Sequence, residues 1–224
     1  MYLNNVAMIA ADTTRSICYV KSLIDNDLLP NFVLLLLNTN SNLMPGQTND
    51  NHDQLLKLLI KANIAYKVSS NNNINSSEVI AEISDRNEHV FIYSGFGGVI
   101  LRDEILLTEK KFLHIHGGYL PNYKGSTTNY FSLINENILG ASSIFLTKDI
   151  DCGPIILRKK FPPPLERDSI DHTYDSQVRA EVLIKTLKNY NSCGKFQFEL
   201  KTNIGGETFY IIHPVLKHLA IIDN

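Results

Sequence analysis

Short apolar runs that alternate with segments of helical period are the feature that most restricts how this chain can fold. The runs "NVAMIAA" (5–11) and "FVLLLLN" (32–38) are almost entirely apolar, as expected for strands covered on both faces. Between them, apolar residues recur at the period of a helix. Further predicted strands, which include some polar residues, follow at 65–69, 89–96 and 111–116. The sequence therefore predicts an α/β fold with a Rossmann-like open, mostly parallel sheet, because parallel strands need crossover helices.

The C-terminal half has a different pattern. A helix is predicted to begin at Ser126 or Thr127, and two strands are predicted to meet at the turn "DCG" (151–153). Apolar spacing in "SQVRAEVLIKTLKNY" (176–190) predicts another helix. The segments "KFQFELK" and "ETFYIIHP", separated by two glycines, predict a C-terminal β-hairpin, followed by a short helix. We expect a main domain over residues 1–190 and, in the same compact unit, a C-terminal extension over 191–224.

Composition and charge exclude several classes of partner. The formal net charge is −2, with 21 basic and 23 acidic residues and no basic block, so a nucleic-acid surface is not predicted. The N-terminal apolar run is too short for a secretory or membrane segment. The three cysteines are widely spaced, which predicts neither a disulfide framework nor a cysteine metal site. We expect a cytoplasmic protein with reduced thiols.

The stretch "LHIHGGYLPNYKG" (113–125) contains the residues best suited to chemistry. His114 and His116 share a face if the strand is extended, and two glycines follow them at the end of a predicted parallel strand, where ligands bind in such sheets. The residues alone leave three interpretations open: a proton-transfer site, a metal site, or histidines of an ordinary strand. A metal site would need a further ligand. The candidates downstream are Asp149, Asp151 and Cys152.

The segments "HIHGGYLPNYKGSTTNYFSLI" and "GASSIFLTKDIDCGPIIL" together resemble the core of the formyltransferases that use 10-formyltetrahydrofolate. That family has Asn-x-His-Pro-Ser-x-Leu-Pro, then a basic residue and Gly, and later Asp-x-Gly. His116 matches the family's histidine, and Asp151 begins the Asp-x-Gly segment 35 residues later. The turn matches at Leu120-Pro121 and Lys124-Gly125. "YSGFGGVIL" is similar to the family's pterin-binding loop, so the resemblance covers residues 89–160 closely and the preceding half loosely.

The resemblance implies that His116 and Asp151 move a proton of the acceptor amine during formyl transfer. A neutral imidazole can take a proton near pH 7, and a neighbouring carboxylate favours the charged ring. This sequence departs from the family in having His114 in place of the Asn that steadies the oxyanion, and Gly117-Gly118 in place of Pro-Ser. An imidazole N–H can donate instead of an amide, and Gly117 has the backbone N–H that proline lacks. We therefore expect His114 to donate to the developing oxyanion.

The resemblance also implies where the ligands bind. The co-substrate would be 10-formyltetrahydrofolate, and no metal is expected. Its expected contacts are Phe96, Gly97, Gly98, Val99, Ile100 and Leu101, in a loop one residue longer than usual for the family, together with Asp149 and Ile150. The expected acceptor contacts are Gly117, Tyr123, Lys124, Ser126 and Thr127. Residues 1–190 would be the formyltransferase catalytic domain.

Amino sugars are the acceptors that this sequence favours within the family. The segment "AADTTRS" (10–16) stands where the purine-pathway branch has a Gly-rich phosphate loop. The branch that acts on initiator tRNA adds a C-terminal nucleic-acid-binding domain, for which we find neither sequence nor basic excess. "HGGYLPNYKGSTTNY" is similar to variants from bacterial nonulosonate pathways, such as that of pseudaminic acid. We expect a nucleotide-linked amino sugar destined for a bacterial surface glycan, and no nucleic-acid or membrane partner.

Further expectations concern less specific features. Thr13, Thr14 and Arg15, at a helix start, could hold a phosphate. Arg179 and the pair Tyr174-Asp175 are expected to form a helix-face salt bridge or to contact substrate. The apolar residues of the last segment could cap the core or pair two subunits in a homodimer. Two other functions stay open: a metal-dependent hydrolase or deacetylase that uses the His-x-His pair, and a non-catalytic folate- or sugar-binding module.

Overall fold

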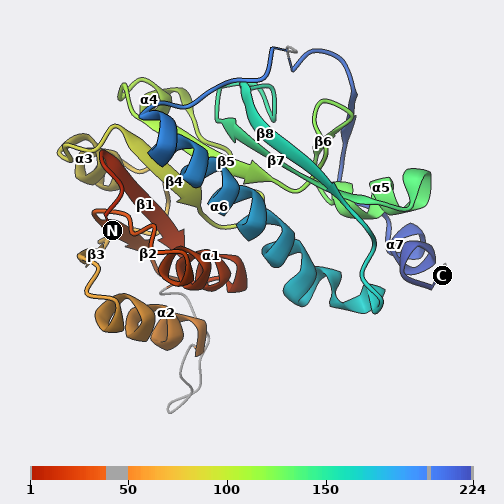
Figure 1. Cartoon of the computed structure of the whole chain (residues 1–224), viewed down its shortest axis with the longest axis horizontal. Helices are drawn as coiled ribbons and strands as arrows, with labels where there is room; N and C mark the ends of the chain where they lie inside the picture. Colours follow the sequence, from red (N-terminus) through yellow and green to blue (C-terminus); the bar gives the residue numbers. More distant parts are fainter. Residues whose placement is uncertain (1, 39–49, 201–202, 223–224) are drawn as a thin grey trace. The chain divides into compact units, whose positions relative to one another are not determined.

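One seven-stranded sheet, in the order β3-β2-β1-β4-β5-β7-β8, runs through the described residues (Figure 1). The computed structural model describes residues 2–38, 50–200 and 203–222. The chain divides into two compact units, Met1–Leu113 and His114–Asn224, with the boundary inside β5 (Lys111–His116). The predicted mostly parallel α/β fold is confirmed. The expected division into residues 1–190 and 191–224 stays a prediction, because compactness does not identify a catalytic domain.

The strands of the first unit are all paired in parallel. β1 (Val6–Ala11) lies between β2 (Val33–Leu36) and β4 (Val90–Ser94), while β3 (Tyr66–Val68) pairs with β2 and β5 with β4. Every residue of β1, β2 and β4 is buried, whereas the three residues of β3 are exposed. Strands covered on both faces need apolar side chains throughout, which explains the continuous runs in the sequence.

Four helices connect these strands in the described part of the first unit. They are α1 (Thr14–Asp25), α2 (Asp50–Lys61), α3 (Ser77–Ser84) and the single-turn α4 (Asp103–Leu106). The hydroxyl of Thr13 accepts from the N–H of Ser16 at 3.2 Å, and the hydroxyl of Ser76 accepts from the N–H of Val79 at 3.3 Å. These bonds satisfy N–H groups that a helix start leaves without partners. Ser76 is thus the N-cap residue of α3.

The second unit is built on an antiparallel pair. β7 (Leu139–Phe145) and β8 (Ile155–Phe161) are the two strands predicted to meet at residues 151–153. α6 (Asp175–Cys193) contacts both strands, and α5 (Thr128–Glu136) contacts β7 and α7 (Pro214–Ile222). A 3₁₀ turn (Arg167–Ser169) and a π-helical turn (Ile170–Tyr174) precede α6. Thr127 is the N-cap position of α5, as expected, but its side chain makes no capping bond.

The C-terminal extension contains the predicted helix, α7, but the hairpin prediction was wrong. β9 (Glu207–Phe209) pairs in parallel with β6 (Tyr123–Gly125), and residues 195–200, its expected partner, form no strand. The ring of Phe209 stacks on those of Tyr123 and Phe131, with centroids 5.5 and 4.5 Å away. Tyr123 and Phe131 are distant from Phe209 in the sequence. Their rings stabilise the pairing of β9 with β6 over pairing with the residues that precede β9 in the chain.

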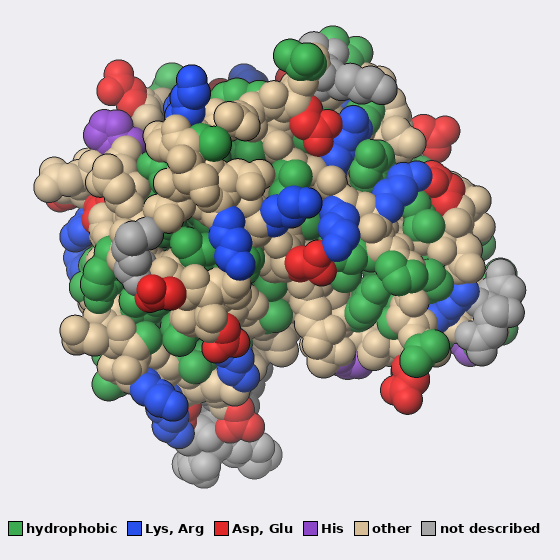
Figure 2. Space-filling model, in the orientation of Figure 1, with side chains coloured by type: hydrophobic (Ala, Val, Ile, Leu, Met, Phe, Trp, Pro, Cys, Tyr) green, Lys and Arg blue, Asp and Glu red, His purple; other side chains and the backbone are tan. Residues whose placement is uncertain are grey.

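The surface carries no charge of one dominant sign on the face seen in Figure 2. Lys and Arg side chains are dispersed over that face, with Asp and Glu side chains among them. This agrees with the nearly balanced composition of the chain. Within the described residues, no helix has both the length and the apolar character needed to cross a membrane.

Candidate active site

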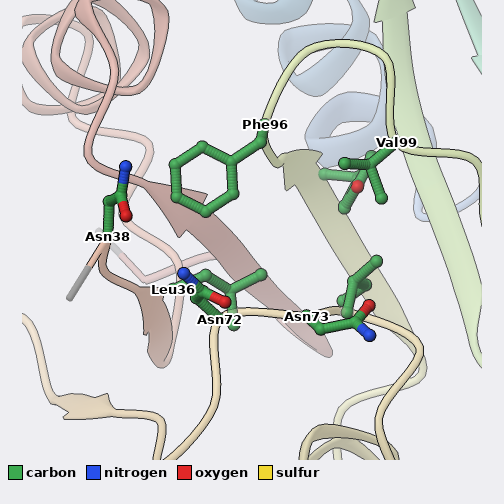
Figure 3. Close-up of a pocket in the computed structure, with 8 residues that line it drawn as sticks. Leu36, Asn38, Asn72, Asn73, Phe96 and Val99 are labelled. Carbon is green, nitrogen blue, oxygen red and sulfur yellow. The ribbon is translucent and has the colours of Figure 1, made fainter. Parts of the chain in front are cut away.

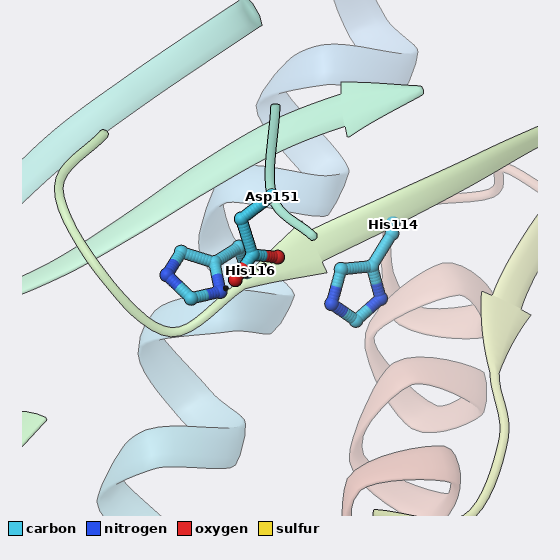
Figure 4. A group of neighbouring side chains, drawn as sticks. All are labelled: His114, His116 and Asp151. Atoms are coloured by element: carbon cyan, nitrogen blue, oxygen red, sulfur yellow. Dashed lines mark ion pairs between the residues drawn. The ribbon is translucent and has the colours of Figure 1, made fainter. Parts of the chain in front are cut away.

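A buried imidazole–carboxylate pair forms at the end of β5 (Figure 4). Nδ1 of His116 lies 3.3 Å from Oδ1 of Asp151, and the two side chains are only 5% and 9% exposed. His116 is the last residue of β5, and Asp151 lies in the turn between β7 and β8. The structure therefore brings together the two residues that the sequence motif linked. Their catalytic roles stay a prediction.

The backbone around Asp151 holds its carboxylate in one position. Asp151 has φ +53°, in the left-handed region that residues other than glycine seldom adopt. The N–H of Gly125 donates to Oδ2 at 2.7 Å. The side-chain amide of Asn203 donates to the carbonyl oxygens of Asp151 and Gly153, at 2.6 and 2.9 Å. An unusual backbone conformation persists only where its surroundings hold it, and these three bonds do so.

The hydrogen bonds of His116 decide where it can accept a proton. Nε2 lies 2.7 Å from the carbonyl oxygen of Tyr123. Because a carbonyl only accepts, Nε2 carries the hydrogen, and the lone pair of Nδ1 in the neutral ring faces Asp151. Burial lowers the pKa of His116, while the Asp151 carboxylate and the Tyr123 carbonyl oppose this shift. The ring is therefore neutral near pH 7, and a proton gained by it would lie on Nδ1 beside the carboxylate.

His114 lies on the same strand face and completes a cluster of three possible metal ligands. One donor atom each from His114, His116 and Asp151 lies within 4.8 Å of the other two (Figure 4). Donors of a tetrahedral zinc site, at about 2.1 Å from the ion, lie about 3.4 Å apart. These side chains would therefore have to move together to hold zinc. Asp149 and Cys152, the other ligands suggested by the sequence, are exposed and are not part of the cluster found among the described residues.

Two glycines make the close packing around His116 possible. A Cβ atom on Gly118 would lie 2.6 Å from Nε2 of His116 and 2.5 Å from the carbonyl oxygen of Tyr123. A Cβ atom on Gly117 would lie 2.3 Å from the guanidinium group of Arg179. Such distances are far below van der Waals contact. Position 118 therefore requires glycine in this structure, because a Cβ atom there would meet backbone, whereas a side chain at position 117 would displace the guanidinium group of Arg179. This gives a physical reason for Gly118 where the resemblance led us to expect serine.

Arg179 ties α6 to the end of β5. Its Nη1 donates to the carbonyl oxygen of Ile115 at 3.1 Å, and its Nε lies 2.9 Å from the carboxylate of Asp175. The expected salt bridge on the helix face is thus confirmed. The side-chain amide of Asn129, on α5, donates to the same carboxylate. The hydroxyl of Tyr174 donates to the carbonyl oxygen of Pro162 at 2.7 Å, so this group is already engaged within the fold.

Most of the residues expected to contact the acceptor already have hydrogen-bond partners within the fold. Tyr123 is buried, its hydroxyl donates to Glu136 at 2.8 Å, and burial raises its pKa to about 12. Lys124 is buried too, with Nζ 3.2 Å from the carbonyl oxygen of Asn203. The hydroxyl of Thr127 accepts from the N–H of Ile212 at 2.9 Å. Of the expected set, Ser126 alone is exposed. Acceptor contacts by these side chains stay a prediction.

The residues expected to hold the co-substrate are largely exposed within their own units. In the loop after β4, the side chain of Leu101 is buried, while Val99 and Ile100 are 39% and 56% exposed. Nothing lies within 4 Å of a Cβ atom built on Gly97 or Gly98, so the backbone there is open to a ligand. Asp149 and Ile150, in the turn after β7, are also exposed. Their roles stay a prediction.

The segment suggested for a phosphate has defined contacts at the start of α1. Thr13 is the N-cap, and Arg15 donates from Nε to the hydroxyl of Ser94 at 3.4 Å and from Nη2 to the carbonyl oxygen of Gly95. The guanidinium group is therefore held at the end of β4. Phosphate binding by Thr13, Thr14 and Arg15 stays a prediction.

Three residues that support the site could not be found from the sequence. Asn203 holds the Asp151 turn from 52 residues away. Thr128 donates from Oγ1 to the carbonyl oxygen of Gly117, and Ser142 does so to that of Gly118 at 2.7 Å. Asn203 lies outside the segments that carry the resemblance, while Thr128 and Ser142 lie within them at positions that the motif does not specify. Their only signal is spatial, because the bonds cross between distant segments.

The fold and the buried pair define a Rossmann-like α/β protein with a histidine and a carboxylate at the end of a central strand. Residues 6–185 match the formyl transferase family, and the chain belongs to that family. Methionyl-tRNA formyltransferase of Caldanaerobacter subterraneus is 26% identical over 118 residues, which are 51% of this chain and 38% of that protein. The counterpart from Citrifermentans bemidjiense is 27% identical over 112 residues, 49% of this chain and 35% of that protein. The matches thus span less than two fifths of these relatives.

Solved structures of similar fold include enzymes with different acceptors. A sugar N-formyltransferase from a Shewanella species has a TM-score of 0.62 and 17% identity, covering 97% of this chain and 86% of that one. An N-formyltransferase from Helicobacter canadensis, in complex with folinic acid and dTDP-3-aminofucose, has a TM-score of 0.59 and 18% identity, covering 92% and 70%. Phosphoribosylglycinamide formyltransferase of Bacillus halodurans has a TM-score of 0.60 and 15% identity, covering 85% and 96%. At these identities the likeness shows the fold alone.

Gly118→Ala is expected to lower the free energy of unfolding by roughly 1–3 kcal/mol, as overpacking does, and to displace the His116 ring from the Tyr123 carbonyl. Denaturant titration would measure the first effect, and nitrogen NMR of the imidazole the second. Gly97→Ala is the matched control, because its Cβ atom would meet nothing within 4 Å. It is expected to change stability by less than about 0.5 kcal/mol. Equal effects of the two substitutions, or an unchanged His116 spectrum in Gly118→Ala, would contradict the packing described.

Proposed function

We propose that this protein is an N-formyltransferase that moves the formyl group of 10-formyltetrahydrofolate to the amine of an amino sugar. The observation that supports it most is the buried His116–Asp151 pair in a chain of the formyl transferase family. That family uses 10-formyltetrahydrofolate as co-substrate. The acceptor is proposed to be a nucleotide-linked amino sugar, destined for a bacterial surface glycan.

His116 is proposed to take the proton that the acceptor amine loses when its nitrogen is formylated. The lone pair of Nδ1 is available for this because the Tyr123 carbonyl occupies the Nε2 hydrogen. Asp151, 3.3 Å from Nδ1, would stabilise the imidazolium that results. Burial keeps the resting ring neutral, so the base is ready near pH 7. The pair thus has both a site for the proton and a charge that favours it.

His114 is proposed to donate a hydrogen bond to the oxygen on which negative charge develops. Its donor lies within 4.8 Å of the His116–Asp151 pair, so it is close to the reacting groups. Hydrogen-bond donors aimed at a developing oxyanion contribute strongly to acyl transfer, because the charge appears only in the transition state. The N–H of Gly117 is proposed as a second donor, since glycine retains the hydrogen that proline lacks.

The loop after β4 is proposed to hold the folate, which supplies the formyl group when bound. Open backbone at Gly97 and Gly98 and the exposed apolar side chain of Ile100 fit an aromatic ring with polar edges. The carbonyl oxygen of Ile100 already accepts from the Asn75 side chain at 2.9 Å, which fixes the loop. Asp149 and Ile150, exposed in the turn before Asp151, are proposed as further contacts.

Several findings bear on the choice of acceptor. The sugar N-formyltransferase fold covers most of this chain, and one neighbour was solved with dTDP-3-aminofucose. The segment after β1 lacks the glycine-rich loop that the purine-pathway branch was expected to have. The curated relatives named above are instead methionyl-tRNA formyltransferases, so that acceptor is the alternative within the family. Acceptor choice is therefore the point that the first experiment must address.

A panel of acceptors incubated with 10-formyltetrahydrofolate would test the proposal. We expect a mass gain of one formyl group on an amino sugar or its nucleotide conjugate, and none on methionyl-tRNA or glycinamide ribonucleotide. His116→Asn is the inactive control. Formylation of tRNA alone would overturn the acceptor, and no formylation of any acceptor would overturn the activity. Metal analysis of the purified protein, followed by hydrolase assays, would identify the alternative in which His114, His116 and Asp151 bind zinc.

The acid limb of the pH profile is expected to lie below the ordinary histidine pKa of about 6.5. The base must be neutral, so kcat/KM should rise as pH increases through the pKa of His116, which burial lowers. Asp151→Asn keeps the shape of the side chain but removes the negative charge. In the unmodified protein that charge raises the pKa of His116 and so opposes the effect of burial. The acid limb of this variant should therefore move to still lower pH, with the plateau reduced by about 10²–10⁴-fold. A wild-type limb above pH 6.5, or a shift upward in Asp151→Asn, would contradict the assignment.

His114→Ala is expected to lower kcat by about 10²-fold, because removing one oxyanion donor has effects of this order. His114→Asn restores an amide donor and should recover most of that rate. Steady-state kinetics at saturating acceptor would measure both. A loss well below tenfold in His114→Ala, with an unchanged or faster His114→Asn, would show that His114 does not have this role.

A further inference from the structure

We propose that a pocket in the first unit, formed where the segments after β3 and β4 face each other, binds the base of a nucleotide. The inference rests on the nucleotide-linked acceptor of the proposed function and deepens it by naming where the nucleotide is recognised. The pocket has a volume of about 300 Å³. Its lining comes from the ends of β2 and β4 and the segments that follow β2, β3 and β4: Leu36, Asn38, Asn72, Asn73, Ile74, Tyr93, Phe96 and Val99.

The arrangement of the lining suits a flat ring. Figure 3 shows Phe96 and Val99 extending from the loop after β4 on one side, and Asn72 and Asn73 from the segment after β3 on the other. The inference thus assigns Phe96 and Val99, expected from the sequence to contact the folate, to the nucleotide, and leaves Gly97, Gly98 and Ile100 of this loop for the folate. Ile74, which also lines the pocket, is buried. An aromatic ring and apolar side chains in the same lining favour stacking of a planar ligand, and a volume of this size holds a base with part of its sugar.

The polar groups of the lining are neutral and can both donate and accept. Three of the eight lining residues are asparagines, and none is Asp, Glu, Lys, Arg or His. A carboxamide offers two N–H donors and a carbonyl acceptor, which matches the donor and acceptor groups on the edge of a nucleobase. A charged ligand group would lose its hydration here without gaining a counter-charge from the lining. The base, rather than the phosphates, is therefore the part that fits.

The walls of the pocket are held in place before any ligand binds. The N–H of Asn73 donates to the Asn71 side chain at 2.9 Å, and the N–H of Asn75 donates to the Asn73 side chain at 3.1 Å. Asn75 then bridges to the opposite wall: its amide donates to the carbonyl oxygen of Ile100 at 2.9 Å, and it accepts from the N–H of Arg102 at 2.8 Å. The asparagine-rich segment is thus a built turn, and preorganisation of this kind lowers the entropy lost on binding.

The position of the pocket and a neighbouring cation point to a nucleotide. In open α/β sheets, ligands bind beyond the carboxyl ends of the strands where the strand order reverses. Here the order reverses at β1, because β2 and β3 follow on one side of it and β4 lies on the other. Arg15 is hydrogen-bonded to the carbonyl oxygen of Gly95, the residue before Phe96. A positive charge beside the neutral pocket would stabilise the phosphates of a nucleotide whose base lies inside it.

An uncharged ring with polar edges is common to nucleobases and to the pterin of folate, so the experiment separates the two. The probes are UDP, dTDP, CDP, GDP and ADP, and separately folinic acid, titrated calorimetrically into the full chain. The variant is Asn72→Leu, which keeps the side-chain volume close but removes its hydrogen bonds. Asn87→Leu, at an exposed asparagine outside the lining, is the matched control. Thermal melting verifies folding, and Asn72→Asp replaces the first variant if that one does not fold.

We expect at least one nucleoside diphosphate to bind. Asn72→Leu should weaken the affinity for that diphosphate at least tenfold and change the affinity for folinic acid less than twofold. Asn87→Leu should bind both as the unmodified protein does. Absence of diphosphate binding, an unchanged diphosphate affinity in Asn72→Leu, or an equal or larger loss for folinic acid would overturn the inference. Formyl transfer is measured separately: diphosphate binding sensitive to Asn72 without any formylation would overturn the proposed function and leave this site standing.

Discussion

The hydrogen bond between Nε2 of His116 and the Tyr123 carbonyl is the interaction on which the rest of the site depends. It determines which nitrogen of the ring carries hydrogen, and so directs the lone pair of Nδ1 toward Asp151. If the hydrogen were on Nδ1 instead, the carboxylate would meet a donor and the carbonyl a lone pair, and the neutral ring could not accept a proton beside Asp151. The chemistry proposed for the pair follows from this one orientation.

Backbone atoms, more than side chains, hold that orientation. The Tyr123 carbonyl reaches the ring only because Gly118 has no Cβ atom, and the Asp151 carboxylate is held by the N–H of Gly125. Asn203 secures the turn that carries Asp151. Backbone groups in a packed core have little freedom, so they position a reactive side chain more firmly than long flexible side chains would. Tyr123 and Lys124, which belong to the motif, are accordingly buried: the Tyr123 carbonyl holds His116, and Lys124 contacts the Asn203 carbonyl.

Predictions from the sequence succeeded where the physical cause is local. The apolar runs identified β1, β2, β4 and β5, because a strand covered on both faces must be apolar along its length. The hairpin failed because β9 pairs with β6, where Phe209 finds two aromatic rings that no neighbouring residue could supply. The short α4 was missed because one turn leaves almost no periodicity to detect.

The sequence by itself determined the fold class and the pairing of a histidine with an acidic residue, because apolar period and motif spacing are written along the chain. Only the tertiary structure decided the tautomer of His116, the support from Asn203, the need for glycine at 118, and the asparagine-lined pocket of the first unit. Each of these depends on atoms from separate segments of the chain that meet within a few ångströms. Such contacts are set by the packing of several elements at once, and no local pattern encodes them.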